Sequence, residues 1–176
     1  AVIPITEDGH YEVSARITDA AGNVTDAISF TEFTVAADKF ILDSTAPVIT
    51  VTHTNNDAQN GKYFAGDRTV VISVKERNFI PDLMSIKMVV KTEDGRTKNL
   101  PDPEWSTTGI THTATITFEE EGQYQFLVNG MDAVCNHATD ISYIGTAVKD
   151  WVIDKHIEKP VFEYVTNGGE YNDAVA

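Results

Sequence analysis

The chain alternates apolar and polar residues with a period of two in several stretches, and this pattern predicts β-strands. In residues 68–75 one face carries Val70, Ile72 and Val74. Residues 111–118 place apolar side chains on one face and threonines on the other. Half-buried strands rich in Thr and Val are typical of antiparallel sheets.

Seven strands are expected between residues 43 and 153, and helical periodicity is absent apart from one short turn within 80–86. Seven short strands in about 110 residues are typical of an Ig-like sandwich. The expected strands cover residues 47–53, 68–76, 84–92, 98–101, 110–118, 122–130 and 146–153.

The chain also repeats itself with a period of about 112 residues. Residues 7–23, EDGHYEVSARITDAAGN, align without gaps on residues 120–136, EEGQYQFLVNGMDAVCN. Residues 40–51 align on 151–165, with a short insertion after the Asp of the second copy. So many matched positions in the same order indicate a duplicated fold.

We therefore predict an all-β chain of tandem Ig-like antiparallel β-sandwich repeats, with one complete unit flanked by partial units. Residues 1–42 are expected to be the C-terminal part of a preceding unit, 43–153 the complete unit, and 154–176 the start of a following unit. The chain begins and ends within a unit, which suggests a piece of a longer protein. Residues 1–42 should be less well packed than 43–153.

Each copy also has a Gly-x-Tyr motif before an expected strand, at Tyr11 and at Tyr124. Many β-sandwiches place a tyrosine corner here, in which the phenol bonds to the backbone of the preceding turn. The plainer alternative is a core aromatic that follows a turn glycine. The Cys…Trp…Cys framework of antibody domains is missing, because Cys135 is the only cysteine.

The motifs DGHY (8–11), DAAGN (19–23) and ILDSTAPVITV (41–51) resemble the bacterial Ig-like domain repeats of large secreted and cell-surface proteins, including giant repeat adhesins. Residues 60–79 resemble the Gram-positive variety of these repeats. The resemblance covers nearly the whole chain. It implies an extracellular or cell-wall location in a bacterium, neighbouring Ig-like repeats as partners, and use as a stalk, spacer or adhesive module.

The charge balance narrows the classes of partner. The 176 residues include 27 acidic and 13 basic side chains, for a net charge of −14. Nucleic acids and anionic membranes attract basic surfaces, so we expect no nucleic-acid partner and no membrane insertion. An acidic chain is better suited to recruiting cations.

A calcium site is expected where units meet. In a sandwich, the loop with Asp132 and Asn136 lies at the end where the chain enters the unit, near Asp43. Oxygen-rich clusters of this kind are what Ca²⁺ selects, and the resemblance to giant repeat adhesins implies calcium at such joints. Our hypothesis is a site formed by Asp43, Asp132 and Asn136, completed by Asp8 or Glu76. The alternative is that these are ordinary turn residues.

Two observations qualify this site. A second joint would use Asp154 with Glu120 and Glu121, but its loop lies beyond the end of the chain. Cys135 stands where the first copy has Gly22. If that position requires a positive φ, the cysteine should cost on the order of 1 kcal/mol.

No enzyme motif is present: the chain has no nucleophile elbow, no phosphate loop and no zinc spacing among its histidines. The predicted function is therefore that of a non-catalytic structural or adhesive repeat. The alternative is a carbohydrate-binding accessory module of a secreted glycosidase or peptidase, which would bind host or cell-wall glycans, or proteins. Trp105, in the connection before residues 110–118, is the candidate ligand-binding residue, unless it covers the end of the core.

Overall fold

The computed structural model describes residues 3–14, 16–25 and 39–157, and in these residues the chain is all-β, as predicted. One short 3-10 helix, η1 (Pro81–Leu83), occupies the expected turn, and no described helix is long and apolar enough to cross a membrane. The strands are β1 (Gly9–Glu12), β2 (Lys39–Leu42), β3 (Val48–His53), β4 (Tyr63–Phe64), β5 (Arg68–Lys75), β6 (Met84–Lys91), β7 (Thr97–Asn99), β8 (Trp105–Thr108), β9 (Thr111–Phe118), β10 (Gly122–Gly130), β11 (Ile141–Ile144) and β12 (Asp150–Ile153).

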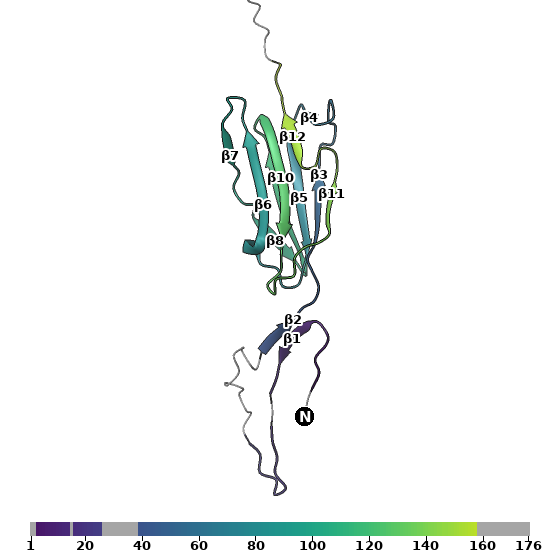
Figure 1. Ribbon diagram of the computed structural model, residues 1–176, viewed down its shortest axis with the longest axis vertical. Coiled ribbons are helices and arrows are strands. Elements are labelled where there is room, and N and C mark those ends of the chain that lie inside the picture. Colours follow the sequence, from purple (N-terminus) through teal and green to yellow (C-terminus); the bar gives the residue numbers. More distant parts are fainter. Residues whose placement is uncertain (1–2, 15, 26–38, 158–176) are drawn as a thin grey trace, which may run out of the picture.

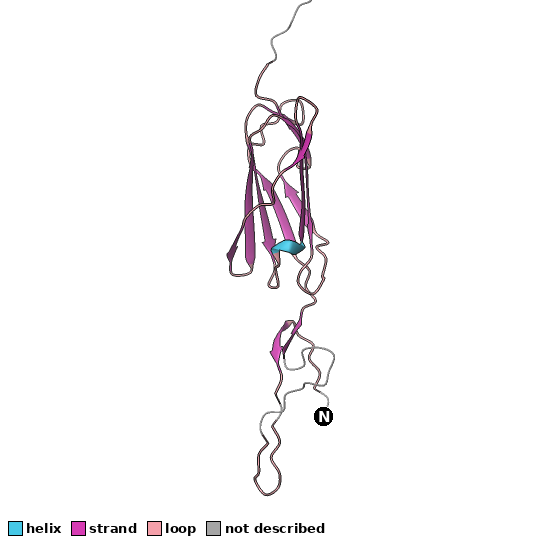
Figure 2. Ribbon diagram, turned by 90° about the vertical axis from the view of Figure 1, so that its left-hand side faces the viewer, coloured by secondary structure: helices cyan, strands magenta, loops and turns pink. Residues whose placement is uncertain are grey.

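Two five-stranded sheets make up the body of the molecule, in the orders β4-β12-β10-β6-β7 and β11-β3-β5-β9-β8. They lie face to face, as Figures 1 and 2 show. The chain arrives from β2 at one end of this body, here called the entrance pole, and leaves after β12 at the opposite end, the exit pole. The arrangement is that of a β-sandwich.

The core lies between the two sheets and is built by the alternation seen in the sequence. In β10 every second residue is buried, including Tyr124, Phe126 and Val128. Trp151 of β12 stacks on Tyr124 with ring centroids 5.5 Å apart, and Phe118 of β9 meets both rings edge-on. Aromatic pairs at these distances add to the stabilisation that burial alone provides.

Within residues 43–153, three strands were not predicted, and two expected strands have clearly different bounds. The missed strands are β4, β8 and β11, each of two to four residues. The strand expected at 98–101 is found at Thr97–Asn99. The expected last strand, 146–153, is confined to Asp150–Ile153, because residues 145–149 cross from one sheet to the other.

The described residues before 43 form a sheet of their own. β1 and β2 pair only with each other, and Gly9 lies opposite Leu42. The buried hydrophobic residues of the described chain all follow Val48, so none belongs to this sheet. In Figure 1 this small sheet lies beyond the entrance pole of the sandwich.

Candidate metal centre at the entrance pole

The loop from Asp132 to Asn136 follows β10 and is folded around the Asp132 carboxylate. One carboxylate oxygen accepts the backbone N–H groups of Val134 and Asn136, both at 2.9 Å. The other accepts the side-chain amide of Asn136 at 2.8 Å. An aspartate that binds its own downstream backbone is a common turn device, and here it leaves Asp132 fully buried.

The first copy of this loop is folded in the same way. Asp19 accepts the backbone N–H groups of Ala21 and Asn23 and the Asn23 amide, each at 2.8 Å. Isolated bridges close the two loops at equivalent positions, Thr18 with Val24 and Met131 with His137. The two aligned sequences therefore make the same contacts.

The alignment of the two loops also shows the backbone conformation that Cys135 has to adopt. Its φ is 71°, and the equivalent Gly22 has a φ of 87°. This is the left-handed region, in which a side chain with a Cβ is strained by about 1 kcal/mol. The position does require positive φ, so the second copy retains its turn despite the substitution.

Three carboxylates converge at the entrance pole. Oxygens of Asp43, Glu76 and Asp132 lie within 4.8 Å of one another. Glu76 and Asp132 are buried, and Asp43 is half-buried. Burial, followed by repulsion from Asp43 and then Asp132, raises the pKa of Glu76.

Of the two residues expected to complete the predicted set, Glu76 joins Asp43 and Asp132 in this group. Asn136 lies beside the three carboxylates and donates its amide to the Asp43 carbonyl oxygen at 3.0 Å. Asp8 does not belong to the group of three: its carboxylate accepts the Ser44 backbone N–H at 3.0 Å and the Thr45 hydroxyl at 2.8 Å. Asp8 therefore ties the preceding turn to the chain that enters the sandwich.

Sequence reasoning missed Asn78. Its side-chain amide donates to the Asp43 carboxylate, and its amide oxygen lies 3.0 Å from Nε2 of His10. Asn78 thus connects β1 to the acidic group. The only signal was the position of ERNF (76–79) after a strand that ends at this pole.

The donor set fits a hard cation. Three carboxylates supply oxygen ligands, and a cavity of about 260 Å³ is lined by Asp8, Asp43 and Glu76, together with the basic residues Lys75 and Arg77 but without Asp132. In the described chain, none of the group's three carboxylates forms a salt bridge. Asp132 accepts three hydrogen bonds, Asp43 accepts one on each carboxylate oxygen, and Glu76 accepts one, so Glu76 offers the freest oxygen. A proton on Glu76 is the other way to relieve the repulsion.

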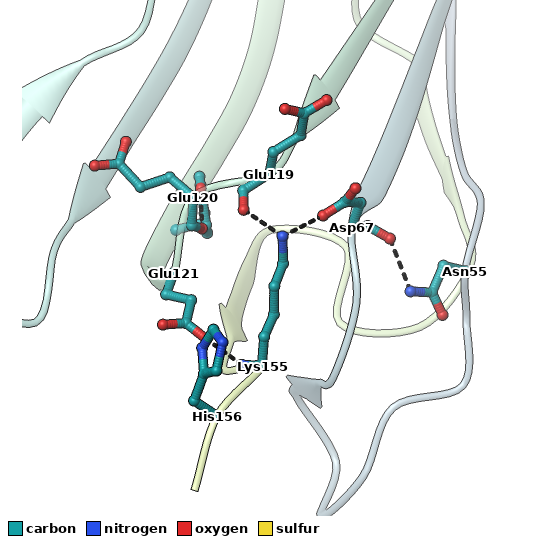
Figure 3. A network of polar contacts seen from close by, with 8 residues as sticks. Asn55, Asp67, Glu119, Glu120, Glu121, Lys155 and His156 are labelled. Atoms are coloured by element: carbon teal, nitrogen blue, oxygen red, sulfur yellow. Dashed lines mark hydrogen bonds and ion pairs between the residues drawn. The ribbon is translucent and has the colours of Figure 1, made fainter. Parts of the chain in front are cut away.

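The exit pole is arranged differently, as Figure 3 shows. Glu121 accepts the backbone N–H of Lys155 at 2.5 Å and lies 2.7 Å from Nδ1 of His156. The Lys155 ammonium pairs with Asp67 at 2.5 Å, so a cation of the chain itself occupies the centre of this network. The expected second grouping is not formed in the described residues, where Glu120 pairs with Lys98 instead.

Glu121 nevertheless has the role of Asp8. The two residues are aligned, and each accepts the N–H of the residue after an aligned aspartate: Ser44 after Asp43, and Lys155 after Asp154. The same contact therefore occurs at both poles of the sandwich.

Both tyrosine corners are present. The Tyr11 hydroxyl donates to the Glu7 carbonyl and the Tyr124 hydroxyl to the Glu120 carbonyl, each at 2.6 Å. Burial raises the pKa of Tyr124 to about 12, with a further contribution from the charge of Glu120. The phenol therefore remains a hydrogen-bond donor at neutral pH.

Trp105 lies on β8 rather than in a connection, which corrects the sequence-based placement. Its ring packs against Phe79 with centroids 4.9 Å apart, and it is partly buried at the edge of the core. Ser106, Thr107 and Thr108 beside it are exposed.

Comparisons of the chain with protein-family models, with curated proteins and with solved structures find no significant match.

Proposed function

We propose that the chain is a non-catalytic segment of a tandem array of Ig-like units, which acts as a rigid stalk, spacer or adhesive module of a secreted or cell-surface bacterial protein. Neighbouring units of the same chain are its principal partners. Calcium at the entrance pole stiffens the joint between units.

The observation that carries this proposal is that the two aligned segments of the chain, residues 7–23 and 120–136, make the same contacts. The β1–β2 pair and the β10–β12 pair have the same register: Gly9 lies opposite Leu42, and Gly122 opposite Ile153. An aromatic pair stacks on each, Tyr11 with Phe40 and Tyr124 with Trp151. A duplicated unit whose ends are joined by one repeated contact pattern is suited to extension along an axis.

The calcium part of the proposal rests on the buried carboxylates of the entrance pole. Burying like charges without a counter-ion is unfavourable, and Ca²⁺ binds carboxylate and carbonyl oxygens at about 2.3–2.6 Å. Asp43 belongs to the entering chain and Glu76 and Asp132 to the sandwich, so a shared ion would restrain the angle between them.

The test is a calcium titration of the whole chain, measured by melting temperature, by calorimetry and by small-angle X-ray scattering. We expect a higher melting temperature and a narrower distribution of shapes in calcium than in EDTA. Absence of both bound ion and melting shift would remove calcium from the proposal. A bent or compact particle in both conditions would count against the stalk.

A second candidate is a carbohydrate-binding module, favoured by the half-buried Trp105 beside three exposed hydroxyl side chains. An aromatic ring flanked by hydroxyls is one way to bind a sugar. Screening the chain on a glycan array, with Trp105→Ala as the comparison, separates this candidate from the stalk. Binding that is lost in the variant would favour it, and no binding would dismiss it.

A further inference from the structure

The last two strands of the sandwich belong to different sheets. β11 pairs in parallel with β3, whereas β12 pairs in parallel with β4 and antiparallel with β10. Residues 145–149 must therefore cross between the sheets; they are called the crossing segment below. Its backbone is unusual, with a φ of 126° at Gly145 and 47° at Ala147.

The crossing segment is held by Arg68, the first residue of β5. The guanidinium donates to the carbonyl oxygens of Thr146 and, at 2.7 Å, Ala147. Asn56 reinforces this contact, because its side-chain oxygen accepts the Thr146 N–H at 3.0 Å and lies 3.3 Å from the guanidinium. Gly145 is required here, since a Cβ would lie 2.5 Å from the same oxygen.

Arg68 is a buried charge with no carboxylate to neutralise it in the described part of the chain. Its guanidinium lies 4.1 Å from the ring centroid of Phe64 and 4.9 Å from that of Trp151. Burial lowers its pKa to about 10, so it remains charged at neutral pH. Because a desolvated cation depends strongly on each acceptor, withdrawing the two carbonyls is costly.

A pull on the two ends of the unit reaches this contact. Force enters at β3, next to the entrance pole, and leaves at β12, next to the exit pole. The hydrogen bonds that join β3 to β11 and β5, and β12 to β4 and β10, run between strands that lie along the pull, so the pull loads them in shear. The crossing segment leads directly into β12, so β12 cannot be drawn out along the pull unless residues 146 and 147 leave Arg68. At the other end of the unit, β3 is held by β5 on one side and β11 on the other.

We propose that Arg68 is a mechanical latch: its contacts with the crossing segment set the force at which the sandwich opens when its ends are pulled apart. This inference rests on the proposed stalk function, because only a load-bearing unit has use for such a latch. The measurement itself concerns the isolated chain and does not depend on calcium or on where the parent protein lies.

The experiment is single-molecule force spectroscopy on the whole chain, held at its two ends in EDTA. We compare the wild type with Arg68→Met, which keeps an unbranched stem but removes every donor, and with Met88→Ala, a core change in β6 away from the latch. Arg68→Met leaves the carbonyls of residues 146 and 147 without their donor and Met88→Ala leaves a cavity in the core, so both variants should lose thermal stability. Arg68→Met should open about 10-fold faster or more at a fixed force, the effect of about 1.4 kcal/mol.

The outcomes separate cleanly. Faster opening in Arg68→Met, without a comparable change in Met88→Ala, supports the latch. An unchanged rate, or equal changes in both variants, overturns it. If Arg68→Met does not fold, the extension trace of the wild type provides the test. A single release of residues 43–153, about 370 Å of chain, supports the latch. A separate, earlier release of residues 136–153, about 60 Å of chain, overturns it. If the protein proves not to be a stalk, the measured effect of Arg68 on the opening force still stands. Failure of the proposed function and failure of the latch can therefore be told apart.

Discussion

At the residue scale, the acidic group shows what topology can and cannot predict. Asp43, Glu76 and Asp132 are distant in sequence, yet the strand order expected for a sandwich brings them to one pole, where they meet within 4.8 Å. The contact of Asn78 with this group and the absence of Asp8 from it were not predictable, because both depend on which of several possible side-chain hydrogen bonds form. Asp8 has four such partnerships with Ser44 and Thr45.

Glu76→Gln should stabilise the protein in EDTA at pH 7. The folded-state pKa of Glu76 is raised, by burial and then by Asp43 and Asp132, so its contribution to stability is present below the unfolded pKa and is lost as pH rises through the folded pKa. The amide keeps an oxygen for the Asn78 N–H, which Glu76 now accepts at 2.7 Å. Relief on the order of 1 kcal/mol is expected, measured by urea unfolding.

The same variant should respond less to calcium, because one ligand has lost its charge. Glu93→Gln is the matched control: it removes an exposed carboxylate near the exit pole and should change neither quantity. Equal calcium responses in wild type and Glu76→Gln would show that any bound ion lies elsewhere.

His53 should make the protein acid-sensitive. It is buried at the end of β3, and burial, followed by the charge of Arg68, lowers its pKa from 6.5 to about 4. Between these two pH values His53 is protonated in the unfolded chain but not in the folded protein. The free energy of unfolding therefore falls as the pH drops from about 6.5 to about 4. The full loss from this residue is about 3 kcal/mol.

The check is urea unfolding from pH 7.5 to 4 for the wild type and His53→Gln. The glutamine variant has no titrating group at this position, so its stability should depend less on pH in that window, whatever its absolute value. Parallel pH profiles for the two proteins would rule out His53 as the cause.

Cys135→Gly should stabilise the protein by about 1 kcal/mol, because it removes a side chain from a backbone position with positive φ. The first copy already has Gly22 there. Ala133→Gly, in the same loop but without positive φ, is the control and should destabilise or have no effect. A gain of the same size in both variants would show that relief of positive-φ strain is not its cause. Chemical denaturation midpoints decide between the two.

At the scale of elements, the sequence predicts long strands far better than short ones. β5, β6, β9 and β10 have eight or nine residues each, and their bounds fall within a residue of the expected ranges, because a full period of alternation identifies them. β4, β8 and β11 have two to four residues and lie at sheet edges. An edge strand is half unpaired and too short to show a period, so tertiary pairing rather than local pattern creates it.

The crossing segment was unpredictable for a related reason. The course of this segment depends on Arg68, a charged residue that is followed in its strand by Thr69 and Val70. The sequence alone gives no reason to expect that the Arg68 side chain is buried. The strand expected at 146–153 is interrupted where two carbonyls turn toward that guanidinium.

At the scale of the whole molecule, packing distinguishes two parts of the described chain. Every buried hydrophobic residue in those parts lies in the sandwich, whereas the residues of β1 and β2 are all exposed or half-buried. Its contacts with the sandwich are polar: Asp8 with Ser44 and Thr45, and His10 with Asn78. Polar contacts at an exposed joint contribute little free energy compared with a core.

Hydrogen exchange should therefore be graded along the chain. Amides of β1 and β2 should exchange through local opening, many times faster than those of β5, β6 and β10, whose exchange requires unfolding of the sandwich. Tyr11→Ala, which removes a corner hydroxyl and a ring stacked 5.3 Å from Phe40, should speed exchange in β1 and β2 alone. Tyr124→Ala, the equivalent change in β10, should destabilise the whole sandwich. Uniform protection from β1 to β12 in the wild type would mean that the two parts fold as one, and the boundary expected near residue 43 would then be wrong.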